Sequence, residues 1–166
     1  SVFASRGANG IDGVVATALG VAAATGAPTT VLIGDVALVH DMSSVASLAS
    51  TSLDVTVVVC DNDGGGIFEF LPQAETLDRP LFEQLFGTPH GLDLTAVISS
   101  MRVPAREFTS TVDLVAGLAG TGPRALIVRS NRTAEVSEHR TLQAAVRRAV
   151  RPSDVGFVES RNRSAR

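Results

Sequence analysis

The sequence has only one cysteine, Cys60, among its 166 residues. A single thiol excludes an internal disulfide framework and a zinc site built from several cysteines, and it fits a reducing compartment. Lysine is absent as well, so all 14 basic residues are arginine, which we interpret as a bias of genome composition. Charged residues make up only 19% of the chain and apolar residues 45%, which excludes a disordered chain.

Charges are distributed unevenly along the chain. The net charge of −3 gives no reason to expect nucleic-acid binding. Residues 1–139 carry 7 Arg and 15 acidic residues, whereas residues 140–166 carry 7 Arg and 2 acidic residues. The segment 151–166 contains Pro152 and many Ser, Arg and Asn residues, with little apolar periodicity. We therefore expect one folded domain over 1–150 and a loose basic tail over 151–166.

An uncharged stretch runs from residue 13 to residue 34 and, at 22 residues, is long enough to cross a bilayer. A turn-forming segment at 25–30 interrupts it, so a buried helix followed by a buried strand is the better interpretation. The beginning of the chain lacks the ordered charged and apolar regions of a secretory signal peptide. We expect no transmembrane segment and a cytoplasmic location. Because the chain begins with Ser1, we also expect a piece of a longer protein.

Three runs of apolar, mostly β-branched residues predict strands at 30–33, 55–59 and 125–128. Each run is continuous rather than alternating, which indicates strands that are buried on both faces, as in a parallel sheet. Weaker strand candidates lie at 2–3 and 103–105.

Helical patterns separate the predicted strands. The Ala-rich segment 11–24 is apolar nearly all round and predicts a helix packed beneath other layers. Apolar residues at helical spacing predict further helices over 38–49, 94–101, 112–118 and 138–150. Asp93 is the expected N-cap of one of them. Strands that alternate with helices predict an α/β fold, a three-layer α/β/α sandwich with a mainly parallel sheet.

Polar residues and glycines follow two of the predicted strands. Asp35 comes soon after the strand at 30–33, and Asn62 and Gly64 follow the strand at 55–59. Ligands of open parallel sheets bind beyond the carboxyl ends of the strands, so we expect these groups at one ligand site. Carboxylate, amide and carbonyl oxygens suit Mg²⁺ and leave room for phosphate oxygens and water. Glycines at 64–66 would let the backbone approach a phosphate closely.

Other interpretations of these residues stay open. Asp35 could cap the next helix, and the glycines could form an ordinary loop. A nucleotide-binding domain is a further alternative, because Asp35 could take the place of a ribose-binding acid, although the spacing of Gly7, Gly10 and Gly13 does not match the dinucleotide fingerprint.

Two other residue types carry little chemical signal. The three histidines, His40, His90 and His139, show no metal-ligand spacing. Cys60 ends a predicted strand, where we expect it to be inert packing.

Three motifs give a more specific signal. They are SRGANGIDG at 5–13, GDVALVHD at 34–41 and NDGGGIF at 62–68. A Gly-Asp pair followed, after 26 residues, by Asn62 resembles the thiamine-diphosphate motif. Together the motifs resemble the 2-succinyl-5-enolpyruvyl-6-hydroxy-3-cyclohexene-1-carboxylate synthases of menaquinone biosynthesis. The resemblance covers about residues 1–150 and concerns the C-terminal, diphosphate-binding domain of that family.

The resemblance implies a cofactor and a metal. Asp35, the Asn62 side chain and the Gly64 carbonyl would bind Mg²⁺, or Mn²⁺ in its place, and the metal would hold the diphosphate of thiamine diphosphate. The remaining cofactor-binding positions would be Gly34, Val36, Ala37, Gly65 and Ile67. Val36 stands where many thiamine-diphosphate enzymes have Gly, and Asp61 stands where many members have Asn. Because Ala37 has no hydroxyl, backbone amides would contact the diphosphate there.

The resemblance also implies catalytic and substrate-binding residues. Ile11 would be the apolar residue that bends the cofactor into its V shape. Arg6 would pair with a substrate carboxylate, a role that suits a bidentate guanidinium. Ile67 and Phe68 would line the apolar side of the substrate pocket.

The implied enzyme is a transferase that decarboxylates 2-oxoglutarate and adds the resulting carbanion equivalent to isochorismate, with the cofactor carrying the chemistry. The family needs a glutamate on a pyrimidine-binding domain of a partner subunit, and no part of this chain matches that domain. We therefore expect a homodimer or homotetramer in the parent enzyme and an inactive isolated domain. The alternatives are an acetolactate synthase-like enzyme and a non-catalytic anion- or nucleotide-binding module.

Overall fold

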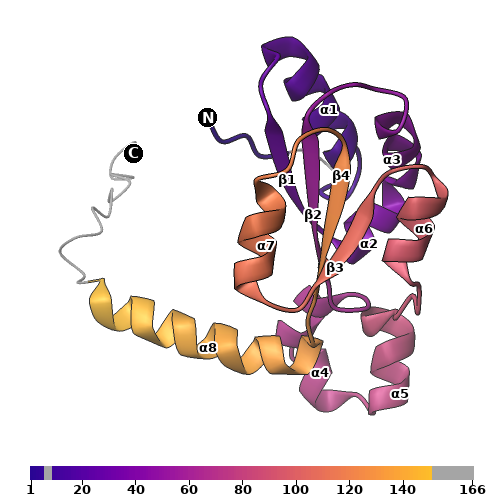
Figure 1. Cartoon of the computed structure of the whole chain (residues 1–166). Coiled ribbons are helices and arrows are strands. Elements are labelled where there is room, and N and C mark those ends of the chain that lie inside the picture. The colour runs from indigo at the N-terminus through magenta and orange to yellow at the C-terminus, as the bar shows by residue number, and fades with distance from the viewer. Residues whose placement is uncertain (6–8, 151–166) are drawn as a thin grey trace, which may run out of the picture.

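The computed structural model describes residues 1–5 and 9–150 of the chain. It confirms the α/β prediction: four parallel strands form one sheet in the order β1-β2-β4-β3 (Figure 1). The strands are β1 (Thr29–Gly34), β2 (Val55–Asp61), β3 (Ala105–Phe108) and β4 (Arg124–Arg129). The helices are α1 (Val14–Thr25), α2 (Asp35–His40), α3 (Met42–Leu48), η1 (Gly66–Phe70), α4 (Gln73–Thr76), α5 (Arg79–Phe82), η2 (Glu83–Gly87), α6 (Leu94–Ser100), α7 (Thr111–Leu118) and α8 (Arg132–Ala149).

The larger core lies on one face of the sheet, beneath α1, α2, α3 and α6 (Figure 1). Val57, Val59 and Ile127 point into it from the two central strands, and each is almost fully buried. Leu38 and Ile98 cover them from α2 and α6 and are fully buried as well. Burial of such side chains stabilises the fold by about 1.5–3 kcal/mol each, so this face holds the sheet and the helices together.

The opposite face of the sheet is covered by α7 over β3 and β4, where Leu114 packs against Val58, Phe108 and Leu126. The β1 end of this face is open, because Leu32 keeps 69% of its surface exposed. The expectation that all three strong strands are buried on both faces is therefore wrong for β1. Within the described residues, no helix covers β1 on this face.

The helix predicted over 38–49 is interrupted at Asp41. The Asp41 side chain is 5% exposed and accepts hydrogen bonds from the backbone amides of Val15 (2.7 Å) and Ala16 (3.3 Å), which begin α1. A buried carboxylate thus satisfies amides at the start of α1 that have no partner within that helix. The predicted cap of α6 is confirmed, since Asp93 accepts a hydrogen bond from the Ala96 amide.

Two further predictions are corrected, and a third is confirmed. Residues 2–3 form no strand. The predicted helix at 112–118 is present as α7, yet its stripe Val112, Val115 and Leu118 faces solvent. Helix α1 packs through Val15, Ala18 and Ala22 on one side, and most residues of its other side are exposed rather than covered by a further layer.

Helix α8 starts six residues before the predicted helix and projects from the body (Figure 1). Its N-cap is Asn131, whose side chain accepts a hydrogen bond from the Ala134 amide. Its apolar side chains Leu142 and Val146 are uncovered, with 60% and 52% of their surface exposed. None of the described helices is both long and apolar enough for a membrane span. The predicted tail at 151–166 lies outside the described residues.

Candidate functional site

Asp35 lies at the carboxyl end of the sheet, as the first residue of α2. Its side chain is almost completely buried, and the backbone amides of Val36 and Gly64 each donate to it at 2.8 Å. Gly34, not Asp35, occupies the N-cap position, so the interpretation of Asp35 as a simple helix cap is not supported. Two backbone amides therefore hold the orientation of this carboxylate.

Asn62 follows β2, the strand next to β1, and its amide is held by a distant residue. Its Nδ2 donates to the Glu135 carboxylate at 2.8 Å, across 73 residues of chain. Its Oδ1 is buried and, among the described residues, has no hydrogen-bond partner. A buried amide oxygen without a partner is costly, and a ligand that donates to or is coordinated by this atom would remove the cost.

The glycine loop after β2 packs tightly against Gly87, the last residue of η2. Gly64 has a φ of 132°, and a Cβ there would lie 2.1 Å from the Gly87 carbonyl oxygen. The Gly65 amide donates to the same oxygen at 2.7 Å. The Gly64 carbonyl accepts from the Gly66 amide at 2.9 Å and keeps its second lone pair. Only glycine fits at position 64, so the need for glycine comes first from packing between the glycine loop and Gly87.

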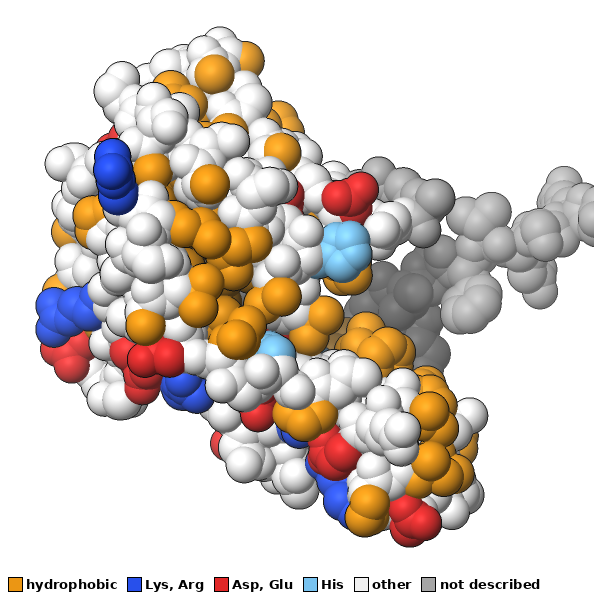
Figure 2. Space-filling model, turned by 90° about the vertical axis from the view of Figure 1, so that its right-hand side faces the viewer, with side chains coloured by type: hydrophobic (Ala, Val, Ile, Leu, Met, Phe, Trp, Pro, Cys, Tyr) orange, Lys and Arg blue, Asp and Glu red, His pale blue; other side chains and the backbone are white. Residues whose placement is uncertain are grey.

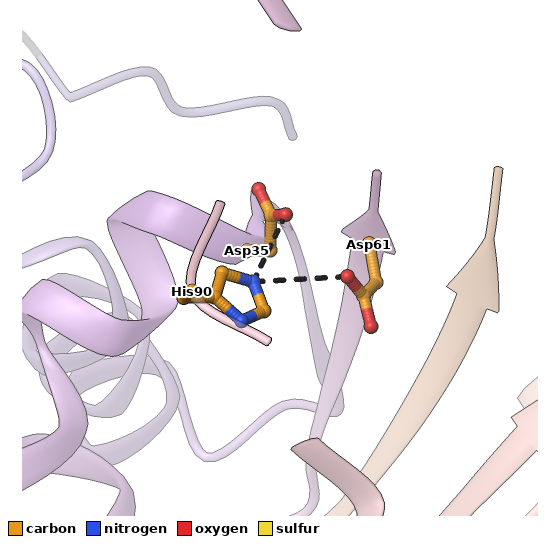
Figure 3. Close-up of side chains that lie close together, drawn as sticks. All are labelled: Asp35, Asp61 and His90. Carbon is orange, nitrogen blue, oxygen red and sulfur yellow. Dashed lines mark hydrogen bonds and ion pairs between the residues drawn. The ribbon is translucent and has the colours of Figure 1, made fainter. Parts of the chain in front are cut away.

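His90 lies between the two buried carboxylates of this edge (Figure 3). Its Nε2 is 3.2 Å from Asp35 Oδ2 and 3.8 Å from Asp61 Oδ1. The histidines show no metal-ligand spacing in the sequence, yet the fold brings His90 to two carboxylates. Sequence reasoning missed it because His90 is 55 residues from Asp35 and belongs to no periodic element. His90 follows η2, whose last residue, Gly87, packs on the glycine loop. Only the three-dimensional structure shows that this packing brings His90 to Asp35.

Asp35, Asp61 and His90 are close enough for a three-ligand metal site. The ring of His90 argues against this use. Its Nδ1 accepts a hydrogen bond from the Leu92 amide at 3.0 Å, so in the neutral ring the hydrogen is on Nε2. Nε2 then donates to Asp35 Oδ2 and has no free electron pair for a metal. We therefore interpret His90 as a donor that orients Asp35.

Burial shifts the pKa of two groups beside the site. It raises the pKa of Asp61, while the Asp63 amide and Arg129 partly oppose the shift. Partial desolvation of the thiol by neighbouring protein atoms also raises the pKa of Cys60, although the residue reaches the surface, and Glu135 and Asp35 add to the shift. Cys60 is exposed, so the expectation of a packed thiol is wrong. Its raised pKa disfavours the reactive thiolate, which keeps the residue poorly nucleophilic.

The remaining predicted residues occupy different places. Val36 and Ala37 are half-buried in the first turn of α2. Ile11 is half-buried before α1. Ile67 and Phe68 lie in η1 with 75% and 40% of their surface exposed. Arg6 lies outside the described residues, so its predicted role remains a prediction.

A groove of about 840 Å³ begins beside the site. It runs along the open edge of β1 and the adjoining side of α1, and Gly34 and Ala37 line the end nearest Asp35. Most of its lining is apolar, including Val14, Val21 and Leu32. Its position places an apolar surface next to the buried carboxylate.

The parallel sheet and the oxygen donors at its carboxyl edge define an α/β domain that is suited to a metal-bound phosphate group. Residues 1–159 match the family described as thiamine pyrophosphate enzyme, C-terminal TPP binding domain, and the chain belongs to this family. The cofactor class of the family is therefore thiamine diphosphate.

Two relatives narrow the comparison. A 2-succinyl-5-enolpyruvyl-6-hydroxy-3-cyclohexene-1-carboxylate synthase of Myxococcus xanthus is 47% identical over 147 residues, which cover 86% of this chain and 25% of that protein. The synthase of the same name from Chloroflexus aurantiacus is 38% identical over 161 residues, which cover 95% of this chain and 27% of that protein. The chain thus spans about a quarter of the length of these relatives.

A solved structure shares the fold. The thiamine diphosphate-dependent 4-hydroxybenzoylformate decarboxylase of Rhodococcus jostii superposes with a TM-score of 0.58 at 21% identity. The match covers 69% of this chain and 22% of that chain. It supports the α/β architecture.

Proposed function

We propose that this chain is the diphosphate- and Mg²⁺-binding part of a 2-succinyl-5-enolpyruvyl-6-hydroxy-3-cyclohexene-1-carboxylate synthase of menaquinone biosynthesis. The observation that carries the proposal is the pair of groups at neighbouring strand ends: the buried Asp35 carboxylate and the buried, unpartnered Asn62 Oδ1. The names of the relatives support the choice of this synthase over an acetolactate synthase-like enzyme. The expected location is the cytoplasm.

The residues present fit a hard divalent cation. Asp35 offers a carboxylate, Asn62 an amide oxygen and Gly64 a carbonyl, which are the ligand types that Mg²⁺ prefers, and Mn²⁺ accepts the same set. None of the three donors is a sulfur or nitrogen atom. Three protein donors leave the remaining positions of an octahedron for phosphate oxygens and water.

The exposed side chains beside the metal site fit the rest of the proposal. When bound, thiamine diphosphate supplies the stabilised carbanion chemistry for decarboxylation and carbon–carbon bond formation. Ile67 and Phe68 would line the apolar side of a pocket for 2-oxoglutarate and isochorismate, and Ile11 would support the bent cofactor. Arg6 would pair with a substrate carboxylate. An Ile67 side chain that is 75% exposed is expected where a second domain or a substrate completes the pocket.

The proposed parent enzyme is a homodimer or homotetramer, because the pyrimidine-binding domain of a partner subunit would supply the activating glutamate. The 166-residue chain alone is therefore expected to show no synthase turnover. Product formed by the purified chain would contradict this division of the site.

Calorimetry tests the proposal. Thiamine diphosphate should bind the purified chain in the presence of Mg²⁺ or Mn²⁺ and not after chelation of the metal. NAD without metal is the control for a nucleotide-binding module, and inorganic diphosphate with Mg²⁺ is the control for a general anion site. Equal binding of thiamine diphosphate with and without metal would contradict the assignment, and binding of NAD alone would favour the nucleotide-binding alternative.

A further inference from the structure

We infer that Glu135 is a positioning residue, which fixes the amide of Asn62 so that its oxygen faces the metal site. The inference rests on the proposed function only for its consequence, metal affinity. The orientation of the Asn62 amide itself is inferred from contacts within this chain, independently of the proposed function. Glu135 does not belong to the motifs at the strand ends, and it lies 73 residues away from Asn62.

Both oxygens of the Glu135 carboxylate are engaged. Oε2 accepts from Asn62 Nδ2 at 2.8 Å, and Oε1 accepts a short hydrogen bond from the Ser130 hydroxyl. An ionised carboxylate has no hydrogen to donate, so the side of the amide that faces it must be the NH₂ group. The planar amide then directs Oδ1 away from Glu135. This is the atom that is buried and unpartnered among the described residues.

Glu135 is itself held rigidly. It lies in the first turn of α8, directly after the capped start of that helix at Asn131. Arg132, in the same turn, forms an ion pair of 2.9 Å with Glu83. The carboxylate is therefore anchored through the backbone of α8 and through Ser130. Its hydrogen bond with Asn62 in turn restricts the orientation of the Asn62 amide. Groups that orient a metal ligand in this way typically change metal affinity about 10- to 100-fold when they are removed.

Nuclear magnetic resonance of the chain without metal tests the orientation directly. The readout is the Asn62 Nδ2 amide pair, assigned by its loss in Asn62→Ala. Glu135→Ala should move this pair toward the chemical shifts of a free amide and speed its hydrogen exchange. The Glu135→Gln amide can accept from Nδ2 or, turned over, donate to Oδ1, so this variant should lie between the wild type and Glu135→Ala. Glu138→Ala, which removes an exposed carboxylate one turn further along α8, is the control and should leave the pair unchanged.

Electron paramagnetic resonance of Mn²⁺ in the presence of thiamine diphosphate tests the consequence. Glu135→Ala should weaken Mn²⁺ affinity about 10- to 100-fold, and Glu135→Gln, which holds the amide in the required orientation only part of the time, should lose less. Equal losses in both variants would show an effect of charge alone and overturn the inference. Unchanged affinity in Glu135→Ala would overturn it as well.

The two experiments separate this inference from the proposed function. If the wild type binds no Mn²⁺ with thiamine diphosphate, the proposed function fails, together with the metal-binding consequence of Glu135. If Mn²⁺ binds and the amide pair of Asn62 is insensitive to Glu135→Ala, only the positioning role fails. Circular dichroism of each variant confirms that α8 is retained.

Discussion

At the scale of single residues, the site is a set of buried oxygen atoms on side chains that are held by hydrogen-bond partners from distant parts of the chain. Asp35 receives hydrogen bonds from the Gly64 amide and from His90, and Asn62 is held by Glu135. Each of these contacts closes a long loop of chain, so the site forms only when the sheet is complete. The chemistry of the site therefore depends on the tertiary fold rather than on one local motif.

Substitution of Asp35 by alanine should abolish Mg²⁺-dependent binding of thiamine diphosphate. The change removes a nearly fully buried carboxylate, which the neighbouring backbone amides cannot replace as a metal ligand. Calorimetry with the cofactor and Mg²⁺ measures the effect. Glu75→Ala removes a carboxylate whose side chain is 75% exposed and should leave binding unchanged. Wild-type affinity in Asp35→Ala would show that the metal assignment is wrong.

The donor role of His90 predicts a contrast between two variants. His90→Ala removes the donor to Asp35 Oδ2, and we expect Mn²⁺ affinity to fall about tenfold or more. His90→Gln can place an amide NH₂ near the position of Nε2 and should retain more affinity than the alanine variant. If His90 instead bound the metal through nitrogen, both variants would lose affinity equally. Mn²⁺ titration with thiamine diphosphate distinguishes the two cases.

The sequence was informative about Asp35 and Asn62 because each follows a strand, and the apolar run of each strand predicts that strand. Parallel strands bring their carboxyl ends to one edge, so two local predictions sufficed to bring these residues together. His90 and Glu135 could not be found in this way. They lie on a loop and on a helix surface, and their partners are 55 and 73 residues distant. Neither periodicity nor motif spacing in the sequence indicates side-chain contacts over such distances along the chain.

At the scale of elements, an ion-pair network holds the segment that carries Ile67 and Phe68. Arg79 of α5 donates to both oxygens of Glu69 in η1, at 2.9 Å and 2.7 Å. Arg79 also forms a short ion pair with Glu83, which in turn pairs with Arg132 of α8. The network joins η1, α5, η2 and α8. It fixes short helices that have few buried apolar residues of their own.

Glu69 gives this network a pH dependence. The hydrogen bonds from Arg79 lower the pKa of the Glu69 carboxyl group. A lowered folded-state pKa contributes stability above the unfolded pKa of about 4.3, and the contribution is lost as the pH falls through the folded value. Glu69→Gln should therefore reduce the free energy of unfolding at pH 7 by about 1–2 kcal/mol, a modest value because Arg79 is half exposed.

Urea unfolding at several pH values measures this effect of Glu69. The difference between wild type and Glu69→Gln should start to shrink as the pH falls below the unfolded pKa of about 4.3, and it should be lost once the folded carboxylate is protonated. Glu75→Gln, at an exposed carboxylate, is the matched control and should change little at any pH. A difference that stays constant from pH 7 to pH 3 would contradict the assigned cause.

The elements also show where periodicity fails as a guide to packing. Val112, Val115 and Leu118 recur at helical spacing, yet they are 40% to 80% exposed, and the helix packs on the sheet through Leu114. A pattern of apolar residues indicates a face that avoids water, and it does not identify what covers that face. The break at Asp41 has a different cause. The Asp41 carboxylate accepts a hydrogen bond from the Val15 amide of α1, and the apolar pattern around Asp41 does not indicate this long-range contact.

At the scale of the whole molecule, apolar surface remains exposed on several sides. Leu32 on the open face of the sheet and Val112 and Val115 on α7 are between 61% and 80% exposed. In the side view, hydrophobic side chains gather in the middle of the face and along the lower lobe, whereas many charged side chains lie nearer its outline (Figure 2). Exposed apolar side chains on several sides of the molecule fit contacts with other domains or chains.

We therefore expect the purified chain to form dimers or larger assemblies rather than a stable monomer. Burial of apolar area is the driving force, so association should increase with protein concentration and persist at high salt, unlike pairing of exposed charges. Light scattering over a range of concentrations measures the mass.

Val115→Asp places a charge on the apolar face of α7 and should shift the equilibrium toward monomer. Ser47→Asp adds the same charge at an exposed position on α3 and should not. A wild-type chain that stays monomeric at high concentration would show that these surfaces are tolerated in water, and equal effects of the two aspartates would assign the association to net charge.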